Sequence, residues 1–328
     1  MSKKASVFSF DSVDSIDDYT QSANALFHFM KRQAFLKDAL KAKALIPRFC
    51  LEDIHYLNLS VDDEEFGEIA ILQKCFCDIP LHKIAANIEL SLTEECKKNT
   101  VGIEETKIAR DNTHVGFYGQ FAIAFSKSWC EQKNLQPIHY LNSDAAYARD
   151  FSALFKKAAS GENLFQEFAE DIIHRLALVK PLRGKMKRQV QTTDMKIDVE
   201  VYKNFHDEQE WRYVPDLTTV AHLNKKLGFE IPPIVANPHL LSLQIVPEKS
   251  YLEEQSQTVS QEECKSLWLD FEYKDIRYLI VPDNESRLDF IDFIMDLPST
   301  NFTRRASLRE RHLLLSKILV LSEIGKDW

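Results

Sequence analysis

Hydrophobic residues recur along the chain at two spacings, and each spacing predicts a different element. Continuous apolar runs at residues 26–30, 70–77 and 276–282 have the length of buried β-strands. Between residues 32 and 45 the apolar side chains stand three and four positions apart, which predicts a helix that Pro47 brings to an end. The first two runs thus flank a helix, and the same mixture continues along the chain.

The remaining elements follow from the same two spacings. We expect strands at residues 48–52, 121–126, 137–142, 193–205, 208–214 and 240–247. We expect helices at residues 81–95, 126–134, 144–178, 285–297 and 308–324, the third of them in two pieces that meet near Gly161. Because strands and helices do not alternate as βαβ units, the predicted class is α+β, with a mixed β-sheet core and flanking helices.

The chain is predicted to fold as a single domain behind a loose arm. Residues 1–20 are polar and acidic and form the arm, and residues 21–328 form the α+β domain. Within the domain we expect a helical insertion at residues 144–178 and a basic loop at residues 180–190. A chain of 328 residues, 45% of them hydrophobic, is long and apolar enough to bury a large core.

Charge and glycine content exclude several classes of protein. The net charge of −9 does not suit binding of nucleic acid over the whole surface, although a local basic patch can still act. The chain has 8 glycines, and no two of them form the GxGxxG or GxxxxGK patterns. Phosphate loops need such glycines so that the backbone can approach the phosphates. Rossmann, P-loop and protein-kinase sites are therefore excluded.

Cysteine usage and the N-terminus indicate the compartment. Most of the six cysteines stand singly in apolar contexts, as reduced thiols do. The N-terminus turns polar and acidic at once, unlike a signal peptide. No apolar run approaches the roughly 20 residues that span a bilayer. We therefore expect a cytoplasmic protein that does not contact membranes.

The most informative polar run is NFHDEQEWRYVP, at residues 204–215. Alternate residues of a strand share a face, so Glu208, Glu210 and Arg212 are expected to lie side by side. Two close carboxylates repel each other, which raises the pKa of one of them unless a cation such as Arg212 intervenes. The group is either a structural Glu–Arg pair on a strand edge or the wall of a binding pocket.

Two residues near the N-terminus are candidates for ligand contacts. His28 stands between two phenylalanines, where it is either a core residue with one hydrogen bond or an imidazole that faces a ligand. Arg48 follows the helix break, where it either forms a salt bridge with Glu52 or clamps a phosphate or carboxylate.

His114 and Tyr118 begin and end an H-x3-Y pattern that a glycine follows. Gly116 and Gly119 permit a tight turn there. Such a turn presents the ring of Tyr118 for stacking on a flat ligand, or the ring packs into the core.

Metal binding is not expected. Cys75, Cys77 and His82 form a C-x-C-x4-H pattern, which has too few ligands for a structural zinc site and lacks a CxxC partner.

The basic loop concentrates positive charge on a chain that is acidic overall. Its cations are Lys180, Arg183, Lys185, Lys187 and Arg188. Such a run is either simply solvated or anchors a phosphate-bearing partner, either nucleic acid or a dinucleotide.

Several segments, taken in order, resemble one protein family. They are residues 28–30 with the helix that follows, IPRF (46–49), KCFCDIPL (74–81), HVGFYG (114–119), AIAFSKSW (122–129), QPIHYLN (136–142), Lys180-Pro181, DEQEWRYVP (207–215), IRYLIVP (276–282) and KILVLSEIGKDW (317–328). The series resembles the AbiGi-type abortive-infection proteins of bacteria, from about residue 24 to the C-terminus. The resemblance implies a phage-defence or toxin–antitoxin protein with a co-encoded defence or toxin protein as its partner.

A more distant similarity is to ADP-ribosyltransferases of the DarT type. It implies that His28 and Arg48 hold NAD, that Tyr118 lies near the nicotinamide, and that Glu210 is catalytic. His114 and Arg212 complete the expected cofactor contacts. The chain lacks the Ser-Thr-Ser strand motif of that class.

The leading hypothesis is therefore a defence protein with an ADP-ribosyltransferase-like core, which uses NAD as substrate and needs no metal. Glu210 then stabilises the charge that develops on the ribose, and Glu208 orients or activates the acceptor. The rival hypothesis is a non-enzymatic antitoxin or sensor that binds a partner toxin. A third is a nuclease in which Asp78, His114 and Glu210 hold a divalent metal.

Overall fold

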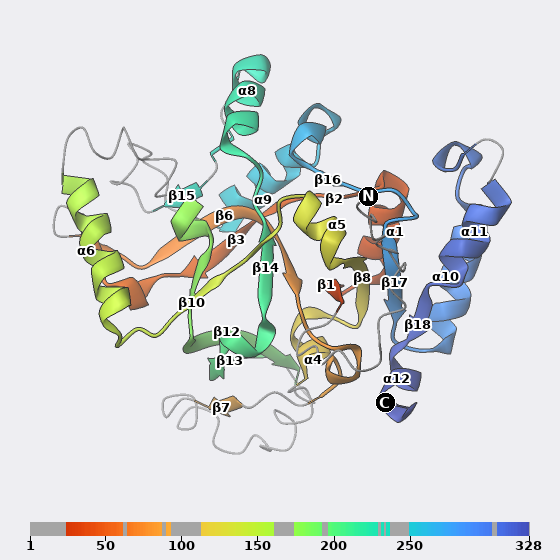
Figure 1. The fold of residues 1–328 in the computed structure, drawn as a ribbon, viewed down its shortest axis with the longest axis horizontal. Helices are drawn as coiled ribbons and strands as arrows, with labels where there is room; N and C mark the ends of the chain where they lie inside the picture. Colours follow the sequence, from red (N-terminus) through yellow and green to blue (C-terminus); the bar gives the residue numbers. More distant parts are fainter. Residues whose placement is uncertain are drawn as a thin grey trace, which may run out of the picture.

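The structure is a computed structural model that describes residues 24–61, 64–86, 90–92, 113–160, 174–191, 196–228, 231–232, 234–236, 249–303 and 307–327. The predicted acidic arm and the strand expected at residues 240–247 lie outside these ranges. Within them, a mixed sheet carries helices on both faces, which confirms the predicted α+β class (Figure 1).

The main sheet contains nine strands within the described ranges, in the order β18-β17-β8-β1-β6-β14-β9, with β3 and β15 also paired to β6. Their bounds are β1 Ala25–Met30, β3 Arg48–Asp53, β6 Glu68–Cys77, β8 Phe121–Ser126, β9 Gln136–Pro137, β14 Glu210–Tyr213, β15 Ile234–Ala236, β17 Ile276–Val281 and β18 Ile318–Val320. The pair β17–β18 is parallel, and the other pairs of this sheet are antiparallel. Strand β6 pairs with four others, and cores pack on both of its faces, so it reads as a nearly continuous apolar run.

Smaller strand groups surround this sheet. They are β2 (Ala44–Leu45) with β16 (Leu269–Asp270), β4 (Leu59–Val61) with β5 (Glu64–Phe66), β10 (His139–Leu141) with β11 (Val179–Pro181), and β7 (Leu90–Leu92) with β13 (Lys196–Asn204) and β12 (Arg183–Gln191). The expected basic loop at residues 180–190 is thus wrong, because this segment lies in β11 and β12. Strand β12 pairs with β13 along its full length, which satisfies its backbone hydrogen bonds despite its charged side chains.

Helices cover the two faces of the sheet in separate groups. The α-helices are α1 Gln33–Ala42, α4 His114–Tyr118, α5 Lys127–Gln132, α6 Ala146–Ser160, α8 Leu217–Leu227, α9 Lys249–Val259, α10 Asn284–Asp296, α11 Ser307–Leu315 and α12 Leu321–Asp327. The 3-10 helices are η1 His55–Leu57, η2 Leu81–Lys83, η3 Phe205–Glu208, η4 Glu262–Leu267 and η5 Ser299–Asn301. Helices α1, α5, α10 and α11 share one core with the strands, whereas η2, α4 and α12 share another.

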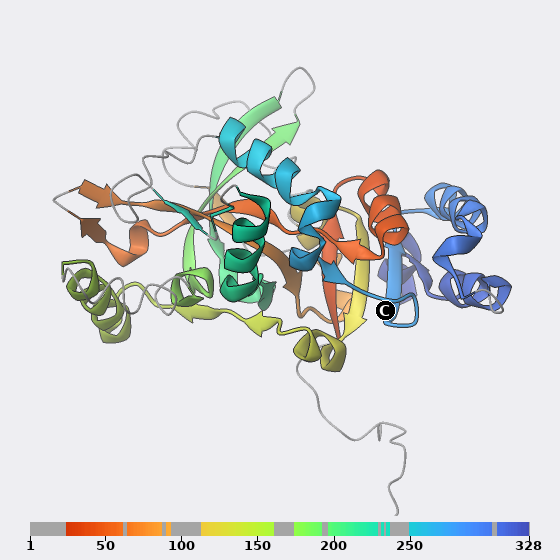
Figure 2. The same ribbon diagram turned by 90° about the horizontal axis from the view of Figure 1, so that it is seen from above.

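Alternation along β6 separates two further cores. Ile69 and Ile71 pack with α6, whereas Ala70 and Leu72 pack with α8 and α9 on the opposite face. Figure 2 shows the molecule from above, with α6 and the C-terminal helices at opposite ends of its long axis. No helix in the described ranges is both long and apolar enough to span a membrane.

Two predicted helices are wrong in the described ranges. The segment 81–95 contains η2 and β7 instead of a continuous helix. The segment 308–324 is divided by β18, whose backbone pairs with β17 in the main sheet. Lys317, just before β18, donates its Nζ to the carbonyls of Tyr273 and Lys274 at 2.9 and 3.1 Å. Tertiary hydrogen bonds thus override the local helical spacing.

Gly119 fixes the join between α4 and β8. The predicted turn before β8 is the short helix α4, and Gly119 follows it at φ 116°, a conformation that favours glycine. A Cβ atom at this position would stand 2.0 Å from the carbonyl oxygen of Met30. The close approach holds α4, and with it Tyr118, against the end of β1.

Candidate functional site

The register of the central strands assigns the predicted site residues to faces. Glu210 is the partner of Cys77 and Arg212 is the partner of Cys75, so Glu210 and Arg212 share a face as predicted. Phe27 of β1 is also a partner of Cys77. Its neighbour in β1, His28, therefore lies on the opposite face from Glu210.

The structure corrects the position of Glu208. The predicted strand 208–214 begins only at Glu210, because Glu208 ends the 3-10 helix η3 and Gln209 adopts the left-handed conformation with φ 43°. The carbonyl of Gln209 accepts a hydrogen bond from the backbone N–H of Asp78 at 3.0 Å, which holds this kink. Glu208 and Glu210 come together through the kink and not through strand alternation.

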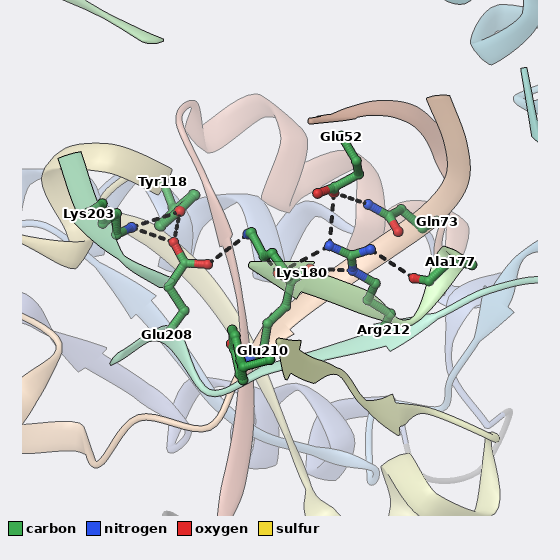
Figure 3. Close-up of polar contacts among 10 residues, drawn as sticks. Glu52, Gln73, Tyr118, Ala177, Lys180, Lys203, Glu208, Glu210 and Arg212 are labelled. Atoms are coloured by element: carbon green, nitrogen blue, oxygen red, sulfur yellow. Dashed lines mark hydrogen bonds and ion pairs between the residues drawn. The ribbon is translucent and has the colours of Figure 1, made fainter. Parts of the chain in front are cut away.

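A chain of ion pairs begins at Glu208 (Figure 3). The Nζ of Lys203 and the hydroxyl of Tyr118 both donate to Oε1 of Glu208, and the Nζ of Lys203 lies 3.0 Å from the Tyr118 hydroxyl. Lys180 continues the chain, with its Nζ 3.0 Å from Oε2 of Glu208 and 2.9 Å from Oε2 of Glu210. Lys180 is thus the cation that separates the two carboxylates.

Arg212 forms the other half of the chain. Its Nε lies 2.7 Å from Oε1 of Glu210, and its Nη2 lies 2.9 Å from Oε1 of Glu52. Its Nη1 donates to the carbonyl of Ala177 at 2.8 Å. The side-chain amide of Gln73 donates to Glu52 at 2.8 Å. Arg212 therefore bridges two carboxylates, but the second one is Glu52 and not the predicted partner.

We call this set the buried ion network. Its charged members are Lys180, Lys203, Arg212, Glu52, Glu208 and Glu210, so three cations balance three carboxylates within it. Lys203 and Arg212 are 0% exposed and Glu210 is 4% exposed, whereas Lys180 and Glu52 keep a small exposed fraction at the edge of the network. A buried charge is tolerated when it is paired and hydrogen-bonded, and each member meets that condition.

The pKa values within the network follow from this balance. Burial acting alone raises the pKa of Glu208, but Lys180 and Lys203 outweigh it and lower this pKa to about 2. Burial is likewise outweighed at Glu210, where Arg212 and Lys180 hold the pKa well below its usual range. Burial opposes the charge of Lys180 too, yet the two carboxylates keep its pKa well above the ordinary value. Glu208 and Glu210 are therefore ionised at neutral pH, so neither carboxylate donates a proton there as a general acid would.

His114 lies beside the network without joining its hydrogen bonds. Its ring centroid is 4.7 Å from that of Tyr118 and 4.7 Å from that of Phe29. The side chain is 1% exposed, and neither ring nitrogen has a hydrogen-bond partner. Burial lowers the pKa of His114 to about 4. The folded protein therefore holds this imidazole neutral and unpaired at neutral pH.

Acidification is expected to destabilise the protein through His114. The unfolded chain binds a proton at this residue near pH 6.5, whereas the folded chain does so only near pH 4. Stability is therefore complete above pH 6.5 and falls by on the order of 3 kcal/mol as the pH drops to 4. Urea unfolding at several pH values measures the slope. His114→Leu is expected to reduce the slope to the part that other groups, such as the buried His28, contribute. It is also expected to gain about 1–2 kcal/mol at pH 7, because two unpaired buried nitrogens disappear. Unchanged pH dependence in this variant contradicts the assignment.

The other two NAD candidates from the N-terminal region lie apart from the network. His28 contacts the carbonyl of Cys75 through Nδ1 at 2.8 Å, and its ring packs near Phe76. Burial, with a smaller effect of Lys74, lowers the pKa of His28 to about 3. Arg48 is exposed at the start of β3, and its predicted partner Glu52 pairs with the network instead.

The cations of the predicted basic loop have different environments. Lys180 is part of the buried ion network, so it is not available to a nucleic acid. Lys185 pairs with Glu200 at 3.0 Å, and Arg183 is exposed. The side chains of Lys187 and Arg188 lie outside the described part of the structure. If this segment contacts a nucleic acid, Lys180 does not take part, since it is the most buried of the described cations of the segment.

Three members of the network escaped prediction as site residues: Lys203, Glu52 and Gln73. Lys203 had a signal in the sequence, because it continues the alternation of Ile197, Val199 and Val201 and so stands at a position of the buried face. A lysine in that position needs a buried carboxylate. Gln73 had a weaker signal, because it and Lys74 are the two polar residues inside the apolar run of β6. For Glu52 as the partner of Arg212, the sequence has no comparable signal.

The ligand set of the nuclease hypothesis, Asp78, His114 and Glu210, does not form a cation site. Asp78 pairs with Lys127 at 2.5 Å, and Glu210 is occupied by Lys180 and Arg212. In the described ranges no three His, Cys, Asp or Glu side chains gather closely enough to hold a metal ion. The five described cysteines are free thiols. The ion pairs of the buried ion network are suited to holding β14, η3, β11 and β13 together.

The chain shows clear similarity to known proteins. Residues 101–282 match the family described as "Putative abortive phage resistance protein AbiGi, antitoxin". A protein of Lactococcus lactis subsp. cremoris named "Abortive phage resistance protein AbiGi" is 32% identical over 293 residues, which cover 87% of this chain and 100% of that relative. No solved structure matches the chain, so the similarity to ADP-ribosyltransferases stays a prediction.

Proposed function

Because the chain belongs to the AbiGi family of abortive phage resistance proteins, we propose that it acts in phage defence as an antitoxin that restrains a partner toxin by binding it. The description of the family as an antitoxin supports this role. A toxin encoded next to this chain is the expected partner.

The burial and pairing of Glu208 and Glu210 in the buried ion network favour a binding function over a catalytic one. Glu208 and Glu210 are 3% and 4% exposed, and each already contacts cations of the protein. A catalytic carboxylate has to contact the substrate at the reacting atoms. With both carboxylates occupied by Lys180 and its neighbours, the network supports a structural role that shapes a binding protein.

Co-expression tests the proposal directly. The full chain is produced together with the product of the adjacent gene, and growth rescue, co-purification and NAD consumption are measured. We expect rescue and co-purification without loss of NAD. The variant Glu210→Gln removes one buried charge and is expected to lose stability, which circular dichroism measures. Under conditions where it is folded, it is expected to rescue as well as the parent chain, since no reacting atom depends on its carboxylate. Loss of rescue in a folded Glu210→Gln protein that still binds its partner contradicts the proposal.

A second candidate is ADP-ribosyl transfer from NAD to DNA, RNA or protein, or hydrolysis of NAD. It is favoured by one observation: Tyr118 and the unpaired His114 lie against the Glu208 end of the network. In this version, Glu210 stabilises the positive charge on the ribose and Glu208 orients the acceptor. Arg212 and Tyr118 are the expected NAD contacts in the cluster, whereas His28 and Arg48 lie apart from it.

NAD turnover by the purified chain decides this second candidate. Release of nicotinamide that disappears in Glu210→Gln but persists in Asp275→Asn, an aspartate outside the network, would support it. Equal release by the Glu210→Gln variant, or none by the parent chain in the presence of DNA, RNA and its partner, would reject it.

A further inference from the structure

A pocket of about 460 Å³ lies where β10, the start of α6 and η3 meet. Rings from all three elements line it: His139 and Tyr140 from β10, Tyr147 from α6 and His206 from η3. Helix α6 stands at the end of the molecule opposite to α10 and α11 (Figure 1). The volume falls in the range of small-molecule sites.

The rings of the pocket are available to a ligand. Tyr147 is 65% exposed, and His139 and His206 are exposed as well. The ring of Tyr140 meets that of His206 edge to face, with centroids 5.2 Å apart. Single exposed rings scattered over a surface are common and indicate no function. Several exposed rings gathered around one hollow indicate a binding site. A flat ligand gains most from them by stacking.

Polar groups in the same lining select a heteroaromatic ligand. Asn142 accepts the backbone N–H of Asp144 through Oδ1 at 3.2 Å, which leaves its amide nitrogen for a further acceptor. Each imidazole adds a nitrogen donor and a nitrogen acceptor when neutral. Among the described residues of the lining there is no carboxylate, ammonium or guanidinium group. The pocket therefore suits an uncharged ring with hydrogen-bonding edges better than a phosphate or a purely apolar ring.

We infer that this pocket binds a nucleobase, stacked on Tyr147 and the neighbouring rings with its polar edge toward Asn142 and the imidazoles. The base belongs either to a free nucleoside or nucleotide or to a single strand, since both present the same ring. The inference does not depend on the proposed antitoxin function.

Tyr140 connects the pocket to the buried ion network. Its hydroxyl accepts the backbone N–H of Glu210 at 2.8 Å, while its ring lines the pocket. The backbone N–H of Ile138 donates to the carbonyl of Glu210 at 3.1 Å. The pocket wall and the first residue of β14 are thus held by hydrogen bonds on both sides of Glu210. The 3-10 helix η3 also joins the two, because His206 lines the pocket and Glu208 belongs to the network.

Titration of the full chain with adenosine, guanosine, cytidine and uridine, followed by calorimetry and saturation-transfer NMR, tests the inference. We expect saturable binding of at least one nucleoside at up to millimolar concentrations. Tyr147→Ala is expected to raise the Kd about tenfold or more, because stacking on an aromatic side chain is lost. Tyr147→Phe keeps the ring and is expected to keep most of the affinity. Leu154→Ala, an exposed residue of α6 outside the lining, serves as the matched control.

Short single-stranded oligonucleotides distinguish the two sources of the base. Tighter binding of the strand than of the nucleoside identifies a strand as the ligand, and equal binding identifies the free compound. Absence of saturation by all four nucleosides and by the strands overturns the inference. So does an unchanged Kd in Tyr147→Ala, or tighter binding of N-acetyltryptophan amide, which has an aromatic ring of protein type.

Discussion

Replacing Arg212 with methionine is expected to lower the free energy of unfolding by about 3–5 kcal/mol, because it leaves Glu52 without its cation and Glu210 with Lys180 alone. The guanidinium contacts Glu210 at 2.7 Å and Glu52 at 2.9 Å, and it is 0% exposed. It also donates to the carbonyl of Ala177, which loses its partner in the variant. Urea unfolding followed by circular dichroism measures the change.

Two further variants make this prediction specific. Arg277→Met removes an exposed arginine of β17 and is expected to change stability by no more than about 0.5 kcal/mol. Arg212→Lys keeps the charge but cannot hold two carboxylates with a rigid fork, so an intermediate loss is expected. A loss below about 1 kcal/mol for Arg212→Met contradicts the view that the network is buried and depends on its pairing.

Replacing Lys203 with methionine is expected to cost about 3 kcal/mol, and a second change should recover most of it. Lys203 is fully buried and donates to Glu208, whose remaining cation is Lys180. Without Lys203 the network carries one uncompensated carboxylate. In the double variant Lys203→Met/Glu208→Gln this charge is gone, while Tyr118 can still donate to the side-chain carbonyl of the glutamine.

A double-mutant cycle over Lys203 and Glu208 measures the coupling of this pair. We expect a coupling energy of about 1–3 kcal/mol, with the double variant more stable than Lys203→Met alone. Additive losses from the two single changes speak against a direct interaction between the side chains. The same cycle over Lys37 and Asp289, an exposed pair at 2.6 Å, is the control and is expected to yield less than about 1 kcal/mol.

The fold was predictable where burial and local spacing agree. The strands at β1, β6, β8 and β17 are apolar runs that the sheet buries, so the pattern alone located them. The prediction failed at β18, whose apolar spacing resembles that of the neighbouring helices but whose backbone pairs with β17. It failed also at β12, where charged side chains indicated a loop although the backbone pairs with β13. In both cases a partner distant in sequence supplies the hydrogen bonds.

The candidate site was predictable only in part. Glu210 and Arg212 share a face because strand alternation is a local property. Glu208 joins them through a left-handed residue at Gln209, which no periodicity indicates. His28 is separated from Glu210 by the sheet itself, and this separation follows from the register of β1 with β6.

The sequence by itself determined the class of fold, the face that carries Glu210 and Arg212, and the family to which the chain belongs. These depend on residue spacing and on motifs, which are properties of short segments. Only the tertiary structure decided which charges meet. Lys180, Lys203 and Glu52 come from three other strands, and burial makes their pairing with Glu208, Glu210 and Arg212 obligatory. A buried charge needs a partner, but the identity of that partner is set by strand register, which the polar run at residues 204–215 does not contain.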